Sequence, residues 1–267
     1  MPVKPAPAAP SPASTLVLLR DRSPRGIEVL LIQRHRASRF AAGDYVFPGG
    51  KIEADDNPQD AAAWCAGLDG AAGARVLGLG GDHARALGFW IGAIRECFEE
   101  VGILLAYGPE GASVRVDDPR FADYRRACHA DNRVFWTMLR AEQLRLATDR
   151  MVYFAHWITP EERPIRFDTR FFAAPMPARQ EAVADDQEII DVRWFTPSDA
   201  VAAFDRGEIS LRTPTQKNLA LFEGAASVDE ALARLEGRLV STVRPPLVAD
   251  AQGAGQRPLL PGDPGYD

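Results

Sequence analysis

The sequence has few cysteines, no long apolar run and no secretory signal, and each absence excludes a class of protein. Only Cys65, Cys97 and Cys128 occur in 267 residues, without disulfide or zinc-ligand spacing, so we expect reduced, buried thiols. No run of about 18 apolar residues occurs, so we expect no membrane span. Residues 1–14 lack the apolar segment of a signal peptide, and we expect a cytoplasmic protein.

An excess of positive charge is also missing. Lysine and arginine number 31 against 37 aspartates and glutamates, and the formal net charge is −6. General nucleic-acid binding depends on neutralising phosphates, so a chain without a basic block is a poor candidate for it. A small phosphorylated ligand needs only a few placed cations. We therefore expect a small phosphorylated molecule as partner, no nucleic acid and no membrane, and leave a homodimer open.

Hydrophobic patterns and turn residues predict a mixed fold of strands and helices. Strands at 15–20 and 27–34 form a hairpin across a turn, and a short third strand stops at the glycine pair of YVFPGG. Further strands are expected at residues 151–158, 166–174 and 187–195. Helices are expected at residues 84–105, 119–129, 133–144, 198–204, 213–222 and 227–240. This order of elements favours an α+β fold.

Three segments lack a clear period. Residues 1–14 are rich in proline and alanine, and we expect a disordered tail there. Residues 51–83 contain an alanine-rich helix candidate and then a flexible, glycine-rich stretch. From Pro245 onward the chain is rich in proline and glycine and is expected to be irregular.

The run RECFEEVGI carries the chemistry. Glu96, Glu99 and Glu100 stand at helix positions i, i+3 and i+4, which places three carboxylates on one face. Their repulsion is relieved by Arg95, one turn before Glu99, or by a hard divalent cation, since Mg²⁺ prefers carboxylate and water oxygens. An acidic, solvated helix face is the alternative. The glycine pair after Pro48 can bring a backbone carbonyl close to the same ion.

Together YVFPGGKIEADD and RECFEEVGI resemble the signature of the Nudix hydrolases, G-x5-E-x7-R-E-U-x-E-E-x-G-U, where U is apolar. Gly50 fits the opening glycine, and the second run fits the second half. The first acid is either Asp56, six residues after Gly50, or Glu53. The resemblance covers about residues 15–205. It implies a Nudix fold, an α/β/α sandwich with a mixed sheet between helices.

The signature is interrupted in this chain. Residues 57–94 separate Asp56 from Arg95, which is 38 residues where the family has seven, so the excess is 31. Such an insertion is physically tolerable because the cost of closing a loop rises slowly with length, and we assign it to 57–88. This interruption, with the upstream run LLIQRHRASRFAAGDYVFPGG, resembles the coenzyme A and acyl-coenzyme A diphosphatases of the family.

The resemblance also implies a chemistry. Nudix enzymes hydrolyse a nucleoside diphosphate linked to another group, with Mg²⁺ or Mn²⁺ as cofactor. It implies that Glu96, Glu99 and Glu100 bind the ion and that Gly50 or its neighbour offers a carbonyl. One of these acids, or Glu188, is then the general base. We expect Arg95 to orient the acids through an ion pair.

Three residues upstream of the acids are candidates for substrate binding. Arg34 and Arg39 suit phosphate through their planar fork of donors, with a solvated basic loop as the alternative. Phe47 suits stacking on a base, with core packing as the alternative. Asp168, among strand aromatics, is expected to be an ion partner of Arg166 or Arg170.

These features lead to one predicted function and its rivals. We expect hydrolysis of coenzyme A or acyl-coenzyme A to 3′,5′-ADP and (acyl-)4′-phosphopantetheine. Rivals that share the signature are hydrolysis of ADP-sugars, dinucleoside polyphosphates or modified nucleotides, and an inactive Nudix fold that senses a ligand. The length then corresponds to one Nudix domain at residues 15–210, followed at 211–267 by a helical extension and an irregular tail.

Overall fold

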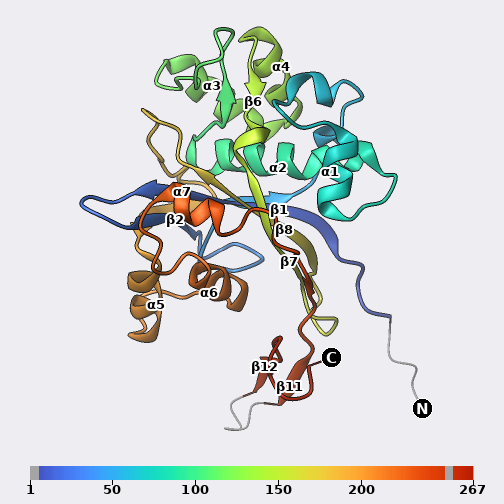
Figure 1. Ribbon diagram of the computed structural model, residues 1–267, viewed down its shortest axis with the longest axis vertical. Helices are drawn as coiled ribbons and strands as arrows, with labels where there is room; N and C mark the ends of the chain where they lie inside the picture. Colours follow the sequence, from blue (N-terminus) through green and yellow to red (C-terminus); the bar gives the residue numbers. More distant parts are fainter. Residues whose placement is uncertain (1–5, 250–254, 267) are drawn as a thin grey trace.

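The computed structural model describes residues 6–249 and 255–266, and its centre is an eight-stranded sheet (Figure 1). The strand order is β10-β7-β8-β1-β2-β3, with β4 beside β1 and β9 beside β2. The strands are β1 (Ser11–Asp21), β2 (Ile27–Arg34), β3 (Tyr45–Val46), β4 (Gly49–Lys51), β7 (Val152–Ile158), β8 (Phe167–Pro175), β9 (Ile189–Phe195) and β10 (Thr242–Val243). Because β1 is antiparallel to β2 and parallel to β8, the sheet is mixed.

Helices cover both faces of the sheet (Figure 1). On one face lies α2 (His83–Val101), with α1 (Gly70–Leu77), α3 (Pro119–Ala130) and α4 (Arg133–Ala141) beyond it. The other face packs against α5 (Pro197–Asp205), α6 (Thr213–Ala220) and α7 (Val228–Ala233). This arrangement confirms the predicted α+β fold and its α/β/α sandwich.

Short elements complete the architecture. Single 3₁₀ turns are η1 (Ala54–Asp56), η2 (Ala61–Trp64) and η3 (Thr148–Arg150). Two further pairs of strands are β5 (Ala106–Tyr107) with β6 (Arg145–Leu146), and β11 (Leu247–Ala249) with β12 (Gln256–Pro258). The β11–β12 hairpin stands apart from the central sheet (Figure 1).

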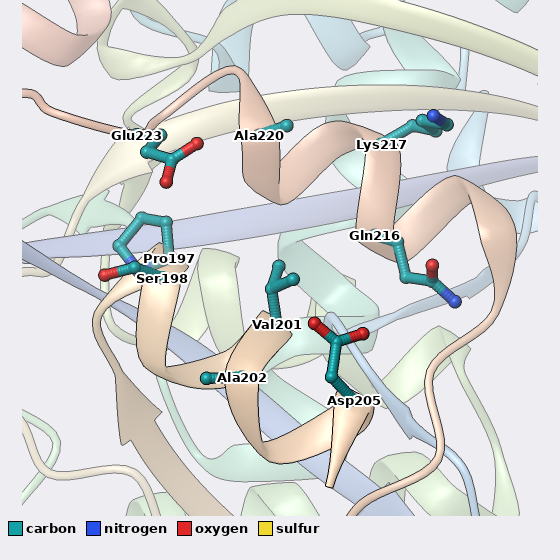
Figure 2. A pocket seen from close by; sticks show the side chains of 9 residues that line it. All are labelled: Pro197, Ser198, Val201, Ala202, Asp205, Gln216, Lys217, Ala220 and Glu223. Carbon is teal, nitrogen blue, oxygen red and sulfur yellow. The ribbon is translucent and has the colours of Figure 1, made fainter.

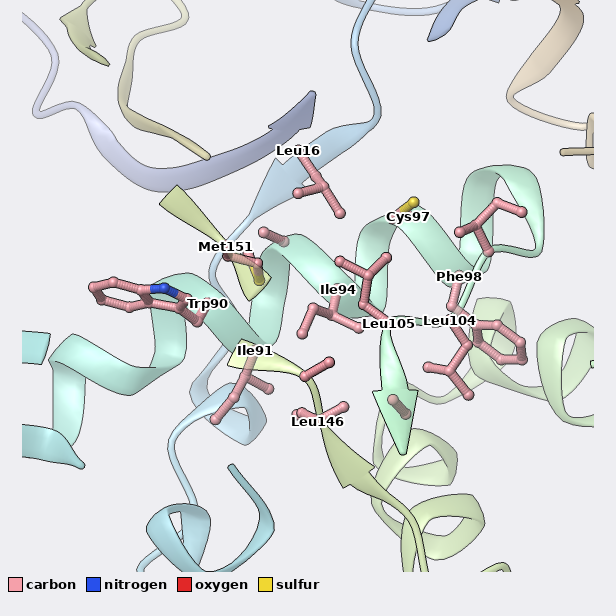
Figure 3. Close-up of a cluster of buried hydrophobic side chains, with 14 of the residues drawn as sticks. Leu16, Trp90, Ile91, Ile94, Cys97, Phe98, Leu104, Leu105, Leu146 and Met151 are labelled. Atoms are coloured by element: carbon pink, nitrogen blue, oxygen red, sulfur yellow. The ribbon is translucent and has the colours of Figure 1, made fainter. Parts of the chain in front are cut away.

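Alternating residues of β1 supply both cores. Leu16 and Leu18 enter the cluster under α2, while Val17 and Leu19 enter the cluster under α5–α7, as the two-residue period of a strand requires. Figure 3 shows the first cluster, where apolar side chains of α2 meet Leu16 and the neighbouring loops. The sheet is therefore buried on both faces, which explains the continuous apolar runs at residues 16–19 of β1 and 29–32 of β2.

Helix α2 matches its prediction closely. The apolar face identified from the sequence is buried, with Ile91, Ile94, Phe98 and Val101 at most 1% exposed. The helix ends at Gly102, whose φ of 73° is the left-handed conformation that favours glycine. The C-terminal end of α2, which carries Glu96, Glu99 and Glu100, is thereby held at a fixed place above the sheet.

Two predictions near the N-terminus were wrong. Residues 11–14, assigned to a disordered tail, belong to β1 and pair with β8, while residues 1–5 lie outside the described part. The short third strand ends at Val46, but the glycine pair expected to stop it belongs to a further strand, because Gly49 and Gly50 form most of β4 and pair with β1. A Cβ at Gly49 would lie 2.4 Å from the Ser14 carbonyl oxygen, so close strand packing, not chain reversal, requires glycine here.

Two helix predictions also need correction. The stretch expected to be flexible and glycine-rich forms α1, whose Gly73 packs against Ala86 and Trp90 of α2. The helix expected at 227–240 ends at Ala233, and Leu239 is 94% exposed. Packing against α2 stabilises α1 despite its glycines, whereas the segment after Ala233 lacks such packing and does not continue the helix. Tertiary contacts therefore outweighed local helix propensity at both places.

The three cysteines have the state predicted from the sequence. Cys65, Cys97 and Cys128 are free and buried, and burial raises the pKa of Cys65 and of Cys128 to about 12. These thiols therefore act as small apolar side chains. In the part of the chain that the structure describes, no helix is both long enough and apolar enough to span a membrane.

Candidate active site

Arg95 is the centre of the site and is only 3% exposed. Its Nε and Nη2 donate to the two oxygens of Asp56 at 2.8 and 3.0 Å, and Nη2 also donates to the Lys51 carbonyl at 3.0 Å. Its Nη1 donates to Glu96 at 3.0 Å and to Glu99 at 3.1 Å. All five N–H groups of the guanidinium are thus satisfied within the chain, which supports the predicted orienting role.

The structure shows which acid pairs with Arg95. Asp56 is 1% exposed and accepts two hydrogen bonds from Arg95, whereas Glu53 is exposed and its backbone N–H donates to Asp56 at 2.9 Å. Asp56 therefore takes the position of the first acid, despite being one methylene shorter than the glutamate of the family signature. The loop of η1 compensates by lying close to α2.

Two glycines of α2 make this close approach possible. A Cβ at Gly92 would lie 2.7 Å from Ile52 Cδ1 and 3.1 Å from Asp56 Oδ2, and one at Gly88 would lie 2.2 Å from Asn57 Oδ1. Glycine inside a helix costs about 1 kcal/mol relative to alanine. Its use here, four residues apart on one face, fits the need to seat η1 against the helix. This spacing was present in the sequence, but we did not predict its role.

The remaining acids meet the glycine pair and Arg34. A Cβ at Gly50 would lie 2.5 Å from Glu96 Cδ, so only glycine leaves space for that carboxylate. The Gly49 N–H donates to Glu100 Oε2 at 2.8 Å, and Arg34 Nη1 donates to Glu100 Oε1 at 3.3 Å. The structure therefore brings Gly50 next to one predicted metal ligand and Arg34 next to another.

Glu188 completes this group at the rim. Its side chain is 59% exposed, and its Oε2 lies 3.6 Å from Arg34 Nη2, so Arg34 lies between Glu100 and Glu188. The structure brings together the residues predicted from distant parts of the sequence. The catalytic and ligand roles of these residues, and a substrate role for Arg34, stay predictions.

We call Asp56, Glu96, Glu99, Glu100 and Glu188 the acidic cluster. Burial raises the pKa of Glu96 and of Glu99 to about 7, although the charge of Arg95 opposes both shifts. Burial also raises the pKa of Glu100 well above its ordinary value, with the neighbouring charge of Glu96 adding to the effect. The cluster sets five carboxyl groups against two guanidinium groups, and this excess of negative charge opposes ionisation.

A divalent cation fits this chemistry. Glu99 Oε1 is buried and has no hydrogen-bond partner, which is costly unless another group compensates it. A cation bound to oxygen ligands would do so and would favour the ionised carboxylates. Among the described residues, however, no three acidic, histidine or cysteine side chains converge as a metal-binding group. In the structure, the positive charge next to Glu96 and Glu99 is supplied by Arg95, whose Nη1 donates a hydrogen bond to each carboxylate.

Phe47 and Arg39 do not join the acidic cluster. Phe47 is 3% exposed and belongs to the core under α5–α7, so its predicted role in substrate stacking is wrong. Phe47 lies directly after β3, and its side chain is buried on the face of the sheet opposite α2. Arg39 is exposed in the loop between β2 and β3, and its phosphate-binding role stays a prediction.

Two cavities lie away from the acidic cluster. One of about 390 Å³ lies between α5 and α6, lined by Val201 and Asp205 from α5 and by Gln216 and Ala220 from α6 (Figure 2), on the far side of the sheet from α2. Another of about 320 Å³ lies beside η1 and is lined by residues that include Trp136 of α4. Neither cavity is lined by an acid of the cluster, so the site is identified by its charges and hydrogen bonds.

Two residues of α3 that contact the C-terminal end of α2 were not predicted from the sequence. Arg125 donates to the carbonyl oxygens of Glu99 and Glu100 at 2.9 and 2.7 Å. His129 Nε2 lies 3.0 Å from the Glu99 carbonyl oxygen. No motif connects them with the signature. The only signal was their place on one face of the helix predicted at 119–129, four residues apart.

Comparison with known proteins identifies the family. The family model of the NUDT19 Nudix domain matches residues 77–221, more than half of the chain. A NUDIX hydrolase from Alicyclobacillus acidocaldarius is 25% identical with a TM-score of 0.70, over 85% of this chain and 96% of that one. The NUDIX domain of Shewanella oneidensis NrtR, complexed with ADP ribose, is 12% identical with a TM-score of 0.42, over 80% of this chain and 86% of that one. The chain therefore belongs to the Nudix hydrolase family and is a pyrophosphohydrolase of nucleoside-diphosphate-linked substrates.

Proposed function

We propose that the protein hydrolyses coenzyme A or acyl-coenzyme A to 3′,5′-ADP and (acyl-)4′-phosphopantetheine, with Mg²⁺ or Mn²⁺ as cofactor. The observation that carries this proposal is the interrupted signature. Although residues 57–94 separate Asp56 from Arg95, the two side chains are joined by two hydrogen bonds. Extra chain is thus accommodated without loss of the acidic cluster. This is the pattern of the coenzyme A-cleaving branch, which the upstream run ending in FPGG also resembles.

The cluster supplies the groups that this hydrolysis needs. Glu96, Glu99 and Glu100 would hold the divalent ion, which supplies charge neutralisation at the diphosphate and a lowered pKa of bound water. Water attacks one phosphorus atom and the phosphoanhydride bond breaks. Glu188, exposed at the rim, or one of the three glutamates of α2 accepts the proton of the attacking water. Arg95 keeps Glu96 and Glu99 in place while this occurs.

Cations near the cluster suit the anionic substrate. Arg34 lies between Glu100 and Glu188, and Arg39 projects from the adjoining loop. We propose that these arginines contact the phosphates of the substrate, because a guanidinium offers paired donors to phosphate oxygens. We also propose a cytoplasmic location, which suits three free thiols, and leave a homodimer open.

The test is an analysis of products from a panel of substrates. Coenzyme A, an acyl-coenzyme A, ADP-ribose, a dinucleoside polyphosphate and an oxidised nucleotide are each incubated with the enzyme and Mg²⁺ or Mn²⁺. We expect 3′,5′-ADP and the matching phosphopantetheine from the first two, at the highest kcat/KM, and loss of most of this activity with Glu99→Gln. A preference for ADP-ribose by orders of magnitude would contradict the substrate. Inactivity on the whole panel with both metals would instead favour a ligand sensor.

A further inference from the structure

The loop that carries Glu188 is docked on the C-terminal end of α2. It runs from residue 176 to 188, between β8 and β9. Gln180 forms two hydrogen bonds with the backbone of Leu104, at 2.9 and 3.0 Å, and the Val183 N–H donates to the Val101 carbonyl at 3.0 Å. The position of Glu188 relative to the acids of α2 therefore depends on how this loop is held.

Arg125 of α3 joins the same loop to two acids of the cluster. Its Nε donates to the Glu99 carbonyl at 2.9 Å, and its Nη2 donates to the carbonyls of Glu100 at 2.7 Å and Val183 at 2.8 Å. The last carbonyls of a helix have no partners within it, and here one guanidinium satisfies two of them. The planar fork of arginine suits this task, whereas a lysine ammonium is a single point of charge.

The glycine that ends α2 leaves space for this contact. Gly102 has a φ of 73°, and a Cβ there would lie 3.3 Å from Arg125 Nη1. A side chain at this position would be strained in its backbone and would crowd the guanidinium. The glycine of the signature thus permits both the end of α2 and the approach of Arg125.

A second contact between α3 and the loop lies one helical turn further on. Asp185 Oδ1 accepts the backbone N–H groups of Gln187, Glu188 and Ile189 at 3.0, 3.0 and 2.8 Å. Its Oδ2 is buried and lies 3.4 Å from His129 Nε2. Asp185 therefore shapes the turn from which Glu188 projects, and α3 faces this turn through His129.

We propose that Arg125 is a positioning residue for the pyrophosphohydrolase reaction. Through its three carbonyl bonds it fixes the backbone of Glu99 and Glu100 against the loop of Glu188. This proposal rests on the proposed function, in the form in which Glu188 accepts the proton of the attacking water. A role limited to capping α2 would lower stability but would not act through Glu188.

The kinetic test compares neighbouring arginines. Arg125→Met removes the fork, while Arg126→Met on the same helix removes an exposed arginine that pairs with Asp123. At a temperature where both are folded, we expect Arg125→Met to lower kcat about tenfold to a hundredfold with little change in KM, because small misplacements of catalytic groups have effects of this size. Arg126→Met should match the wild type, and an equal kcat in both variants would overturn the proposal.

A double variant separates positioning from capping. If Arg125 acts through Glu188, adding Arg125→Met to Glu188→Gln causes little further loss of kcat, since the two effects are coupled. If the fold-loss of kcat in the double variant equalled the product of the losses in the two single variants, the proposal would be overturned. If Arg125→Met does not fold, Arg125→Lys, which keeps the charge but not the fork, takes its place in the same comparison.

A measurement without substrate distinguishes failure of this proposal from failure of the proposed function. Hydrogen exchange of the backbone amides of Val183 and of residues 187–189 reports how firmly the loop is held. We expect faster exchange in Arg125→Met than in Arg126→Met, with β7 and β8 unchanged, even if no tested substrate is hydrolysed. Equal exchange in the two variants would show that Arg125 does not hold the loop.

Discussion

Two ionic clusters, each largely buried, contact α2, and they differ in charge balance. The acidic cluster has five carboxyl groups with Arg34 and Arg95. The second, which we call the strand cluster, consists of His156, Asp168 and Arg170 on β7 and β8. Asp168 Oδ1 lies 2.7 Å from Arg170 Nη1 and 2.5 Å from His156 Nε2, and the Arg170 guanidinium lies 4.4 Å from the ring centroid of Phe89 on α2.

The pKa values of the carboxyl groups shift in opposite directions in the two clusters. Burial alone would raise the pKa of Asp168, but the hydrogen bond from His156 and the charge of Arg170 bring it below its ordinary value. In the acidic cluster, burial outweighs Arg95 and raises the pKa of Glu96 and of Glu99 to about 7. A cluster whose positive and negative charges are equal can have a purely structural role. An excess of buried carboxyl groups, in contrast, indicates a site that binds a cation or a proton.

The largest effect is expected from removing the central cation of the acidic cluster. Arg95→Met leaves Asp56, Glu96 and Glu99 without their shared partner, and breaking a buried pair in this way costs about 3–5 kcal/mol. Denaturant unfolding measures the loss. Arg126→Met, which is exposed, should lie within about 0.5 kcal/mol of the wild type. If Arg95→Met lowered the free energy of unfolding by no more than Arg126→Met does, the stability of the cluster would not depend on Arg95.

The next effect concerns activity rather than stability. Glu99→Gln removes a proposed ligand but keeps the shape of the side chain, so kcat should fall on the order of 10²-fold or more, as several kcal/mol of transition-state stabilisation depend on the ion. The free energy of unfolding should not decrease, because a buried carboxylate in a negative environment is removed. Turnover equal to the wild type at saturating Mg²⁺ would refute the assignment.

The strand cluster should show the reverse pattern. Asp168→Asn weakens the bonds to His156 and Arg170 and should cost about 1–3 kcal/mol of unfolding free energy. Its kcat, measured below the unfolding transition, should stay within about twofold of the wild type, given that none of these residues contacts the acidic cluster in the hydrogen bonds described. A tenfold loss of kcat would break the distinction between the two clusters.

The smallest effect is a dependence of stability on pH. Because the pKa values of Glu96 and Glu99 are raised in the folded state, that state holds more protons than the unfolded state between about pH 4.5 and 7. Metal-free protein should therefore lose about 1 kcal/mol or more as pH rises through this window. Thermal unfolding in a chelator should give a lower Tm at pH 8 than at pH 5.5, and Glu99→Gln should reduce the difference. A Tm that rises steadily to pH 8 would contradict the raised pKa values.

Local patterns in the sequence were sufficient for the hairpin, for α2 and for the three acids on one helix face. Each depends on the spacing of residues within one element. In α2, for example, the spacing of Ile91, Ile94 and Phe98 places all three on the face that packs against the core. One of the two predicted arginine partners of Asp168, Arg170, is confirmed, because alternation along β8 places it on the same face, whereas His156 on β7 was not predicted.

Features that depend on contacts between distant elements could not be predicted. Phe47 follows a two-residue strand, and which face it buries is decided by α5–α7, about 150 residues later in the sequence. The choice of Asp56 over Glu53 depends on how closely η1 approaches Gly88 and Gly92. Arg125 enters the site from a helix outside the signature, and no local pattern distinguishes it from Arg126.

The central claim, that the unbalanced acidic cluster binds a divalent cation, is tested most directly by titration calorimetry with Mn²⁺ in the absence of substrate. Wild type, Glu99→Gln and Asp168→Asn are compared at pH 8, where the carboxyl groups of the cluster are ionised more fully than at pH 6. We expect equal Mn²⁺ affinity for wild type and Asp168→Asn and a loss of at least about tenfold for Glu99→Gln. The same affinity in all three proteins, or no binding to the wild type, would contradict the claim.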